Sequence, residues 1–267
     1  MTRAGSPKRA ALSELGVDPV SGDLKEPESL RQACRGADTL ISTATASTSR
    51  RAGDSLETVD RDGHLALIEM ARREGVRRFV YVSVEPKLRE TYFVRIKRQV
   101  EAAVRASGME WAIVQPSCFM EIWLSPLLGW DFANATVRIV GKGDKPVSFI
   151  SIGDVAAFVV LSALHRATTG RDLPIGGPEA VSLLEVRRIC EEITNKRFRA
   201  RHLPIGLLRL MAALVRPFSR VQSELMMLGV ATAKEGNPVD MTAMLQEFPM
   251  KMTSIRDYVA RVCVQGG

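Results

Sequence analysis

Polar side chains that could do chemistry stand where successive apolar segments of the sequence end. Gly22-Asp23-Leu24 follows one such segment, and Ser42-Thr43-Ala44-Thr45 ends the next. Ser83 ends a third, and Pro116-Ser117-Cys118-Phe119 follows a fourth. Ligands of open α/β sheets lie outside the carboxyl ends of the strands. If the segments are parallel strands, these side chains therefore meet at one edge of a sheet.

Each of the first two groups has a functional and a purely structural interpretation. Asp23 can accept a hydrogen bond from an adenine amine while Leu24 covers the ring, or it can form a turn and cap a helix at Pro27. The small residues 43–45 can let a ribose approach the backbone, or they can be an ordinary exit from the strand.

The residues of the third and fourth groups are equally open. Ser83 can bond a carbonyl oxygen or line a nicotinamide subsite, and it can also simply cap a turn. Lys97, on the helix after Ser83, can bond ribose hydroxyls and lower a neighbouring pKa if it faces inward. Beside Arg95 and Arg98 it can equally be one more exposed lysine.

Residues 116–119 can wrap a nicotinamide ring, or they can be a strand end followed by a core phenylalanine. No histidine is near Cys118 in the sequence, so we do not expect a nucleophilic thiol there.

The apolar periodicity predicts the elements that would position these residues. Strands are expected over 17–20, 39–44, 79–83, 111–115, 137–140, 147–150, 172–175 and 198–203. Helices are expected over 8–15, 27–35, 57–74, 90–107, 154–165 and 182–194, and through most of 204–264. Ser182 and Glu185 have the spacing of a capping box. The alternation predicts an α/β fold with a doubly wound parallel (Rossmann-type) sheet and a smaller, mostly helical C-terminal part.

Length and composition bound the domain organisation. The 267 residues are 46% hydrophobic and 25% charged, which is ordinary for a globular protein. We expect an incomplete Rossmann-like domain over 1–165, with 121–136 on the substrate side, and a substrate or lid region over 166–267. The net charge of +7 is spread mainly over helices, so we interpret it as solvated helix faces.

The cysteines and histidines argue against metal or disulfide chemistry. The 4 cysteines and 3 histidines are scattered and have no zinc spacing. A reducing, cytoplasmic compartment is the default expectation. The sequence shows no secretory signal, and its longest apolar run, 155–164, is shorter than the ~20 residues of a membrane span.

The ordered set of segments resembles the NmrA-like group of atypical short-chain dehydrogenase/reductases. The resemblance rests most clearly on Gly75 to Ser83, Lys97 to Glu101, Gln115 to Met120 and Ser151 to Ala156. It runs from about residue 3 to 178 and more loosely to a helix at 254–262.

The resemblance implies an NAD(P)-binding fold and assigns places along the cofactor. Asp23 and Leu24 fall on the adenine side. Thr43, Ala44, Thr45 and Ser83 fall at the middle, Lys97 at the ribose, and 116–119 at the nicotinamide end. Arg3 falls where many relatives carry an arginine that meets the 2′-phosphate, so NADP (NADPH) is expected rather than NAD. Lys97 and Ser83 are the candidate catalytic residues.

The chain departs from the family in two ways. No counterpart of the first strand and its Gly-rich loop precedes residue 17. We therefore expect an N-terminally truncated chain with impaired cofactor binding, an expectation that sub-micromolar NADPH binding would contradict. Counting back from Lys97, the position of the usual tyrosine holds Phe93, and Tyr92 is one residue off.

Two functions follow from the resemblance. The first is an NADP-dependent oxidoreductase of an unknown small molecule, its substrate held near Trp123, Trp130, Met226 and Met227. The alternative is a non-catalytic redox-sensing regulator, assembly factor or complex subunit, which the absent tyrosine favours. The apolar segment 203–218 could then lie on a protein partner or a membrane surface, or it could be a lid or core helix.

Nucleic acid is not an expected partner, because no recognition motif is present and tyrosines number only 3.

Overall fold

The computed structural model describes residues 1–3, 5–47, 49, 51–88 and 91–265. The chain forms two compact units that are interleaved along the sequence. Unit 1 comprises Met1–Ser83, Tyr92–Ile113 and Leu161–Asp172, and unit 2 comprises Val84–Thr91, Val114–Val160 and Leu173–Gly267. The division into domains at residue 165 remains a prediction.

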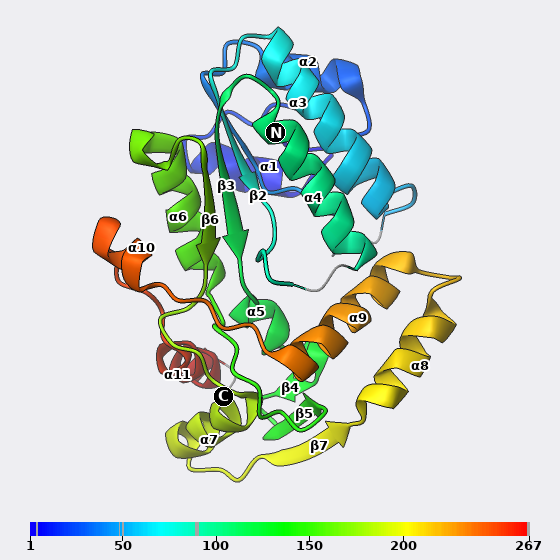
Figure 1. The fold of residues 1–267 in the computed structure, drawn as a ribbon, viewed down its shortest axis with the longest axis vertical. Coiled ribbons are helices and arrows are strands. Elements are labelled where there is room, and N and C mark those ends of the chain that lie inside the picture. The colour runs from blue at the N-terminus through cyan, green and yellow to red at the C-terminus, as the bar shows by residue number, and fades with distance from the viewer. Residues whose placement is uncertain (4, 48, 50, 89–90, 266–267) are drawn as a thin grey trace. The chain divides into compact units, whose positions relative to one another are not determined.

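Unit 1 contains most of the helices and strands of the N-terminal half (Figure 1). They are α1 (Lys8–Glu14), α2 (Pro27–Cys34), β1 (Thr39–Ser42), the π-helical η1 (Leu56–Gly63), α3 (His64–Arg73), β2 (Arg78–Val82), α4 (Tyr92–Arg105) and η3 (Arg166–Thr168). Three elements run through both units: β3 (Glu110–Pro116), α6 (Ile152–Leu164) and β6 (Arg171–Ile175).

Unit 2 contains the remaining elements. They are α5 (Met120–Trp123), η2 (Pro126–Leu128), β4 (Trp130–Asp131), β5 (Thr136–Val140), α7 (Leu183–Thr194), β7 (Arg199–Leu203), α8 (Ile205–Val215), α9 (Arg220–Glu235), α10 (Thr242–Glu247) and α11 (Ile255–Gln265). None of the helices described is both long and apolar enough to cross a membrane.

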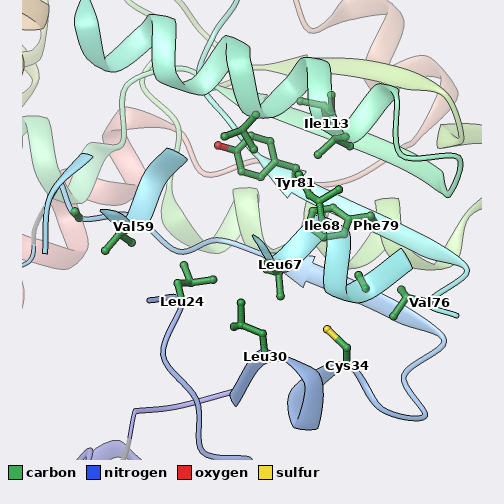
Figure 2. Packing of buried hydrophobic residues seen from close by; sticks show 14 residues of the cluster. Leu24, Leu30, Cys34, Val59, Leu67, Ile68, Val76, Phe79, Tyr81 and Ile113 are labelled. Atoms are coloured by element: carbon green, nitrogen blue, oxygen red, sulfur yellow. The ribbon is translucent and has the colours of Figure 1, made fainter. Parts of the chain in front are cut away.

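The main sheet has the strand order β1-β2-β3-β6, and the predicted α/β fold with a parallel sheet is confirmed. β1 and β2 pair in parallel with Leu40 opposite Phe79. Phe79 and Tyr81 alternate with Val80 along β2, so they share one face of the sheet. On that face they join a buried core with α2, α3 and α4 that includes Leu30, Leu67 and Val100 (Figure 2).

Unit 2 has its own smaller sheet and core. β4 pairs with β5 in antiparallel fashion, and β5 pairs with β7 in parallel. Trp130, Phe149 and Phe198 pack with residues of α7 and α11 in a second buried cluster. Ser182 caps α7, and the predicted capping box with Glu185 is confirmed.

Two predicted strands are wrong. Residues 17–20 form no strand, and Thr2 and Ser21 instead make an isolated parallel bridge. Residues 147–150 are also irregular, because Val147 bridges to Val181 and Asn237 while Ile150 bridges to Phe119. In both places single bridges to irregular segments satisfy backbone groups that a continuous strand partner would otherwise bond.

The predicted helix over 57–74 is observed as two consecutive helices, the π-helical η1 and the α-helical α3. The predicted helix over 90–107 is observed as α4. Its predicted first residue, Glu90, lies outside the described residues.

Candidate functional site

A buried ion pair between Lys97 and Asp60 lies at the centre of unit 1. Lys97 Nζ is 3.1 Å from Asp60 Oδ1, and the two side chains are 4% and 0% exposed. The other carboxylate oxygen of Asp60 accepts the backbone N–H of Ala46 at 2.8 Å. Burial alone would lower the pKa of Lys97, but the neighbouring Tyr81 and Asp60 reverse this and raise it. Lys97 is therefore a fixed interior cation rather than an exposed lysine.

Two aromatic rings enclose the lysine. Lys97 Nζ is 5.3 Å from the ring centroid of Tyr81 and 5.6 Å from that of Phe93, within the range of cation–π attraction. Burial raises the pKa of the Tyr81 phenol, which therefore stays protonated. Tyr92 points elsewhere, as its place on the helix predicts, and its hydroxyl donates to Glu57 at 2.7 Å.

His64 adds a second buried polar group beside the ion pair. Its Nε2 is 2.9 Å from Ser42 Oγ, and its Nδ1 is 3.0 Å from the carbonyl oxygen of Val59. Since a carbonyl only accepts, Nδ1 donates and Nε2 accepts from Ser42. Burial lowers the pKa of His64 to about 4, with a smaller effect from the charge of Lys97. His64 is therefore neutral at physiological pH.

Ser83 is buried and bonds to a carboxylate. Its hydroxyl donates to Glu101 Oε1 at 2.5 Å, so its one proton is used in an internal contact. Glu101 also pairs with Arg98 at 2.5 Å and with Arg105 at 3.2 Å. The proposed contact of Ser83 with a cofactor or substrate remains a prediction.

The residues expected on the adenine side form an ionic network. Arg3 contacts Asp23 at 3.0 Å and Asp54 at 2.8 Å, and Lys25 contacts Asp54 at 2.7 Å. Burial would raise the pKa of Asp54, but hydrogen bonds from Arg3, Lys25 and Ser49 hold it well below its usual range. Arg3 is thus already neutralised, which favours a structural role. Its contact with a 2′-phosphate remains a prediction.

Asp23 forms the turn of its structural interpretation, because the N–H of Glu26 donates to its carbonyl oxygen at 2.9 Å, but its side chain does not cap helix α2. The N-cap residue is Glu26, without a side-chain bond, and the carboxylate of Asp23 accepts the N–H of Lys25 at 3.0 Å. Leu24 is 5% exposed and belongs to the core of unit 1 (Figure 2). A Cβ on Gly63 would lie 2.8 Å from Leu24 Cβ, so this close approach requires the glycine.

Small exposed residues follow strand β1. Thr43 and Ala44 are exposed and Thr45 is half-buried. The hydroxyl of Thr45 accepts the N–H of Ser47 at 3.1 Å. Thr43 and Ala44 therefore offer a hydroxyl and a short side chain at the carboxyl end of a parallel strand, where nucleotides bind in such sheets.

In unit 2, residues 116–119 are tied into the fold by their backbone. Ser117 N–H donates to the carbonyl of Ile175 at 2.8 Å, and Ile150 N–H donates to that of Cys118 at 3.0 Å. Burial raises the pKa of Cys118 to about 12, which favours the protonated thiol. Pro116 is buried at the end of β3, and Phe119 is half-buried.

Asn237 holds this segment in place, and no sequence motif had pointed to it. Its side-chain amide donates to Ser117 Oγ at 3.0 Å and lies 3.8 Å from Cys118 Sγ. It also borders a cavity of about 270 Å³ lined by Lys87, Leu88, Ala231, Glu235, Gly236, Asn237 and Pro238. Asn237 therefore borders both the cavity and the segment 116–119.

The predicted substrate residues are not equally available. Trp130 is 1% exposed and belongs to the core of unit 2, so its assignment to a substrate surface is wrong. Trp123 packs against the same core, and Met226 and Met227 are half-buried. No cluster of three or more metal-ligating side chains occurs in the part of the chain that the structure describes.

The sequence matches the protein family described as NAD(P)H-binding over residues 1–166. The chain belongs to this family.

Two curated relatives differ in their described roles. The photosystem II assembly factor Ycf39 of Synechocystis sp. is 26% identical over 94% of this chain and 79% of its own length. The (4-alkanoyl-5-oxo-2,5-dihydrofuran-3-yl)methyl phosphate reductase of Streptomyces griseus is 29% identical over 77% of this chain and 69% of its own length. The family therefore contains both an enzyme and an assembly factor at similar distance from this chain.

A solved structure shares the fold. The NADPH-dependent quinone oxidoreductase of Escherichia coli, in complex with NADPH, superposes with a TM-score of 0.75. It is 17% identical, over 96% of this chain and 88% of its own. The fold is thus that of NAD(P)-binding reductases.

The residues of unit 1 fit a dinucleotide in chemistry. Thr43 and Ala44 leave an exposed hydroxyl and backbone after β1, which suit a ribose. Lys97 supplies a fixed positive charge, which the carboxylate of Asp60 at 3.1 Å already balances. The fit is poorest for a 2′-phosphate at Arg3, because Asp23 and Asp54 already occupy the guanidinium.

Proposed function

We propose that this protein binds NADPH through unit 1 and reduces a small molecule. The observation that carries the proposal is the buried pair of Lys97 and Asp60 in a chain of the NAD(P)H-binding family. A buried ion pair contributes little to stability compared with apolar residues of the same size. Interior charges of this kind gather at functional sites, and we assign this pair to the cofactor.

The proposed roles follow the order of residues along the cofactor. Asp23 and Leu24 serve the adenine, and residues 43–45 with Ser83 serve the middle of the molecule. Lys97 serves the ribose. That residues 116–119, which belong to unit 2, serve the nicotinamide end stays a prediction from the sequence. The bound nicotinamide would supply a hydride.

The proton that follows the hydride has no tyrosine donor in the usual place. Phe93 carries no hydroxyl, the hydroxyl of Tyr92 donates to Glu57, and Tyr81 is 0% exposed. We therefore propose that water protonates the product. This favours acceptors such as quinones or conjugated carbonyl compounds, whose reduced forms take up protons from water readily.

The test is NADPH oxidation, followed by absorbance, over a panel of quinones and carbonyl compounds. The double variant Lys97→Met/Asp60→Asn neutralises both charges and keeps an acceptor for the N–H of Ala46. We expect it to remain folded and to lose at least tenfold in rate. The control Arg31→Met/Glu74→Gln, which removes a surface ion pair, should keep the rate. Equal rates in the two variants would contradict the role of the buried pair.

A second function is supported by the similarity to Ycf39, which extends over 94% of this chain. In this proposal the protein binds NADPH as a regulator or assembly factor and transfers no hydride. NADPH binding without oxidation by any acceptor, together with tight co-purification of one protein from the native cells, would favour it over the reductase.

A further inference from the structure

Helix α8 of unit 2 exposes one apolar face to solvent. The exposed fractions are 46% for Leu207, 55% for Leu210, 38% for Met211, 65% for Leu214 and 92% for Phe218. These residues follow one another at intervals of one, three or four, which keeps them on one side of a helix and its extension. We call them the α8 stripe.

The stripe is not the face by which α8 packs. Leu208 and Ala212 are buried, with exposed fractions of 7% and 2%. α8 packs side by side with α9 (Figure 1). The helix therefore has two apolar sides, of which one is covered. Single exposed leucines are common on protein surfaces, but contiguous apolar patches mark binding surfaces.

The charged residues in the segment that contains the stripe all have one sign. Residues 196–220 contain 7 lysines and arginines and no aspartate or glutamate. By helical periodicity, Arg209 and Arg216 lie on the side of α8 opposite the stripe. Both are exposed, and so are Arg199 and Arg201 on β7.

The same segment borders a basic hollow in unit 2. Its volume is about 560 Å³, and it is lined by Arg187, Arg197, Phe198, Arg199, Ala200 and His202. Among these residues, Arg187 pairs with Glu191. A hollow of this composition suits a phosphate group, because arginine binds phosphate oxygens through two parallel hydrogen bonds.

We propose that the α8 stripe and the basic segment 196–220 dock on the surface of an anionic lipid bilayer. An apolar face opposite a face of arginines is the pattern of helices that lie in the membrane interface. The stripe would enter the boundary between headgroups and acyl chains, and the arginines would remain among the phosphates. A second copy of the chain would present the same positive charge and be repelled. The inference does not depend on NADPH chemistry.

The test is flotation of the whole protein with vesicles of phosphatidylcholine, alone or mixed with phosphatidylglycerol. Binding is expected only to the anionic vesicles and should weaken as salt is raised. The variant Leu214→Glu/Phe218→Glu should reduce the bound fraction at least tenfold. The control Leu15→Glu/Leu164→Glu alters residues that are 78% and 76% exposed elsewhere, and it should bind as the unchanged protein does.

Three results would overturn the proposal. One is that the protein fails to bind anionic vesicles although its thermal unfolding transition shows that it is folded. Another is an equal loss of binding in the stripe variant and its control. The third is a dimer, detected by sedimentation, that the stripe variant abolishes while no vesicle binding is seen, because the stripe would then cover a second copy.

Discussion

The two units of this protein place their positive charges differently. In the described part of the chain, both cations with less than a tenth of their surface exposed, Lys97 and Arg78, belong to unit 1. Arg78 donates to the carbonyls of Ser162 and His165 and to the hydroxyl of Thr168. Unit 2 buries carboxylates and neutral polar groups, while its arginines stay half-buried or exposed.

This difference separates two uses of charge. A buried cation is held in one position by its acceptors, and the low dielectric of the interior strengthens its interactions with them. An exposed arginine beside apolar side chains can contact an extended surface such as a lipid bilayer, and salt screens its charge. We infer that unit 1 is organised for a small bound molecule and unit 2, at α8, for a surface.

The largest effect is expected when the buried charge of unit 1 loses its partner. Asp60→Ala leaves Lys97 uncompensated in the interior and should lower the free energy of unfolding by about 3–5 kcal/mol. Urea denaturation measures this. Asp62→Ala, at a side chain that is 57% exposed in its pair with Arg61, should change stability by no more than ~0.5 kcal/mol. A similar small loss for Asp60→Ala would show that the interior tolerates the bare lysine.

A test of unit 2 concerns its close backbone packing rather than its charge. A Cβ on Gly177 would lie 1.9 Å from the carbonyl oxygen of Phe149, so Gly177→Ala should cost about 3 kcal/mol or more of unfolding free energy. Gly206→Ala on α8 meets nothing within 4 Å and should stabilise by up to ~1 kcal/mol through helix propensity. Thermal unfolding should show shifts of opposite sign; equal shifts would contradict the packing.

The neutral histidine of unit 1 makes stability depend on pH. The pKa of His64 is lowered to about 4 by burial, whereas in the unfolded chain it is about 6.5. Between these values the unfolded state binds more protons, so stability is lost as pH falls through this window. From pH 6.5 to 5 the loss should be about 2 kcal/mol. His64→Gln should flatten the profile over that range; an unchanged slope would show that other groups cause it.

The fold was largely predictable because its signals are local. The apolar run at 79–83 and the capping box of Ser182 and Glu185 are both found as expected. The apolar segments at 17–20 and 147–150 carry the same local signal, but neither forms a strand. Residues 147 and 150 make only isolated bridges. Strand formation depends on a partner strand, and a single sequence does not show which partner is present.

For the candidate site, the sequence indicated which residues to consider but not which contacts they make. That Lys97 faces inward was one of two open interpretations, and its partner Asp60 was missed. A signal existed, since Asp60 and His64 are four residues apart and share the apolar side of the predicted helix 57–74 with Leu67. Polar groups on an apolar helix face need interior partners. Those partners come from distant segments, so only the structure identifies them.

The central claim is that a nucleotide cofactor binds where strand β1 ends. The most direct test is calorimetric titration of NADPH into three proteins: the unchanged protein, the variant Ala44→Glu and the control variant Ala10→Glu. Both alanines are exposed, so each can be replaced without disturbing the core. For the unchanged protein we predict measurable binding with a Kd no lower than about 1 μM. Binding should be at least tenfold weaker in Ala44→Glu, because the new carboxylate repels the phosphates. The affinity of Ala10→Glu, on α1, should be unchanged. Equal affinities in the two variants, or no binding by the unchanged protein, would contradict the account.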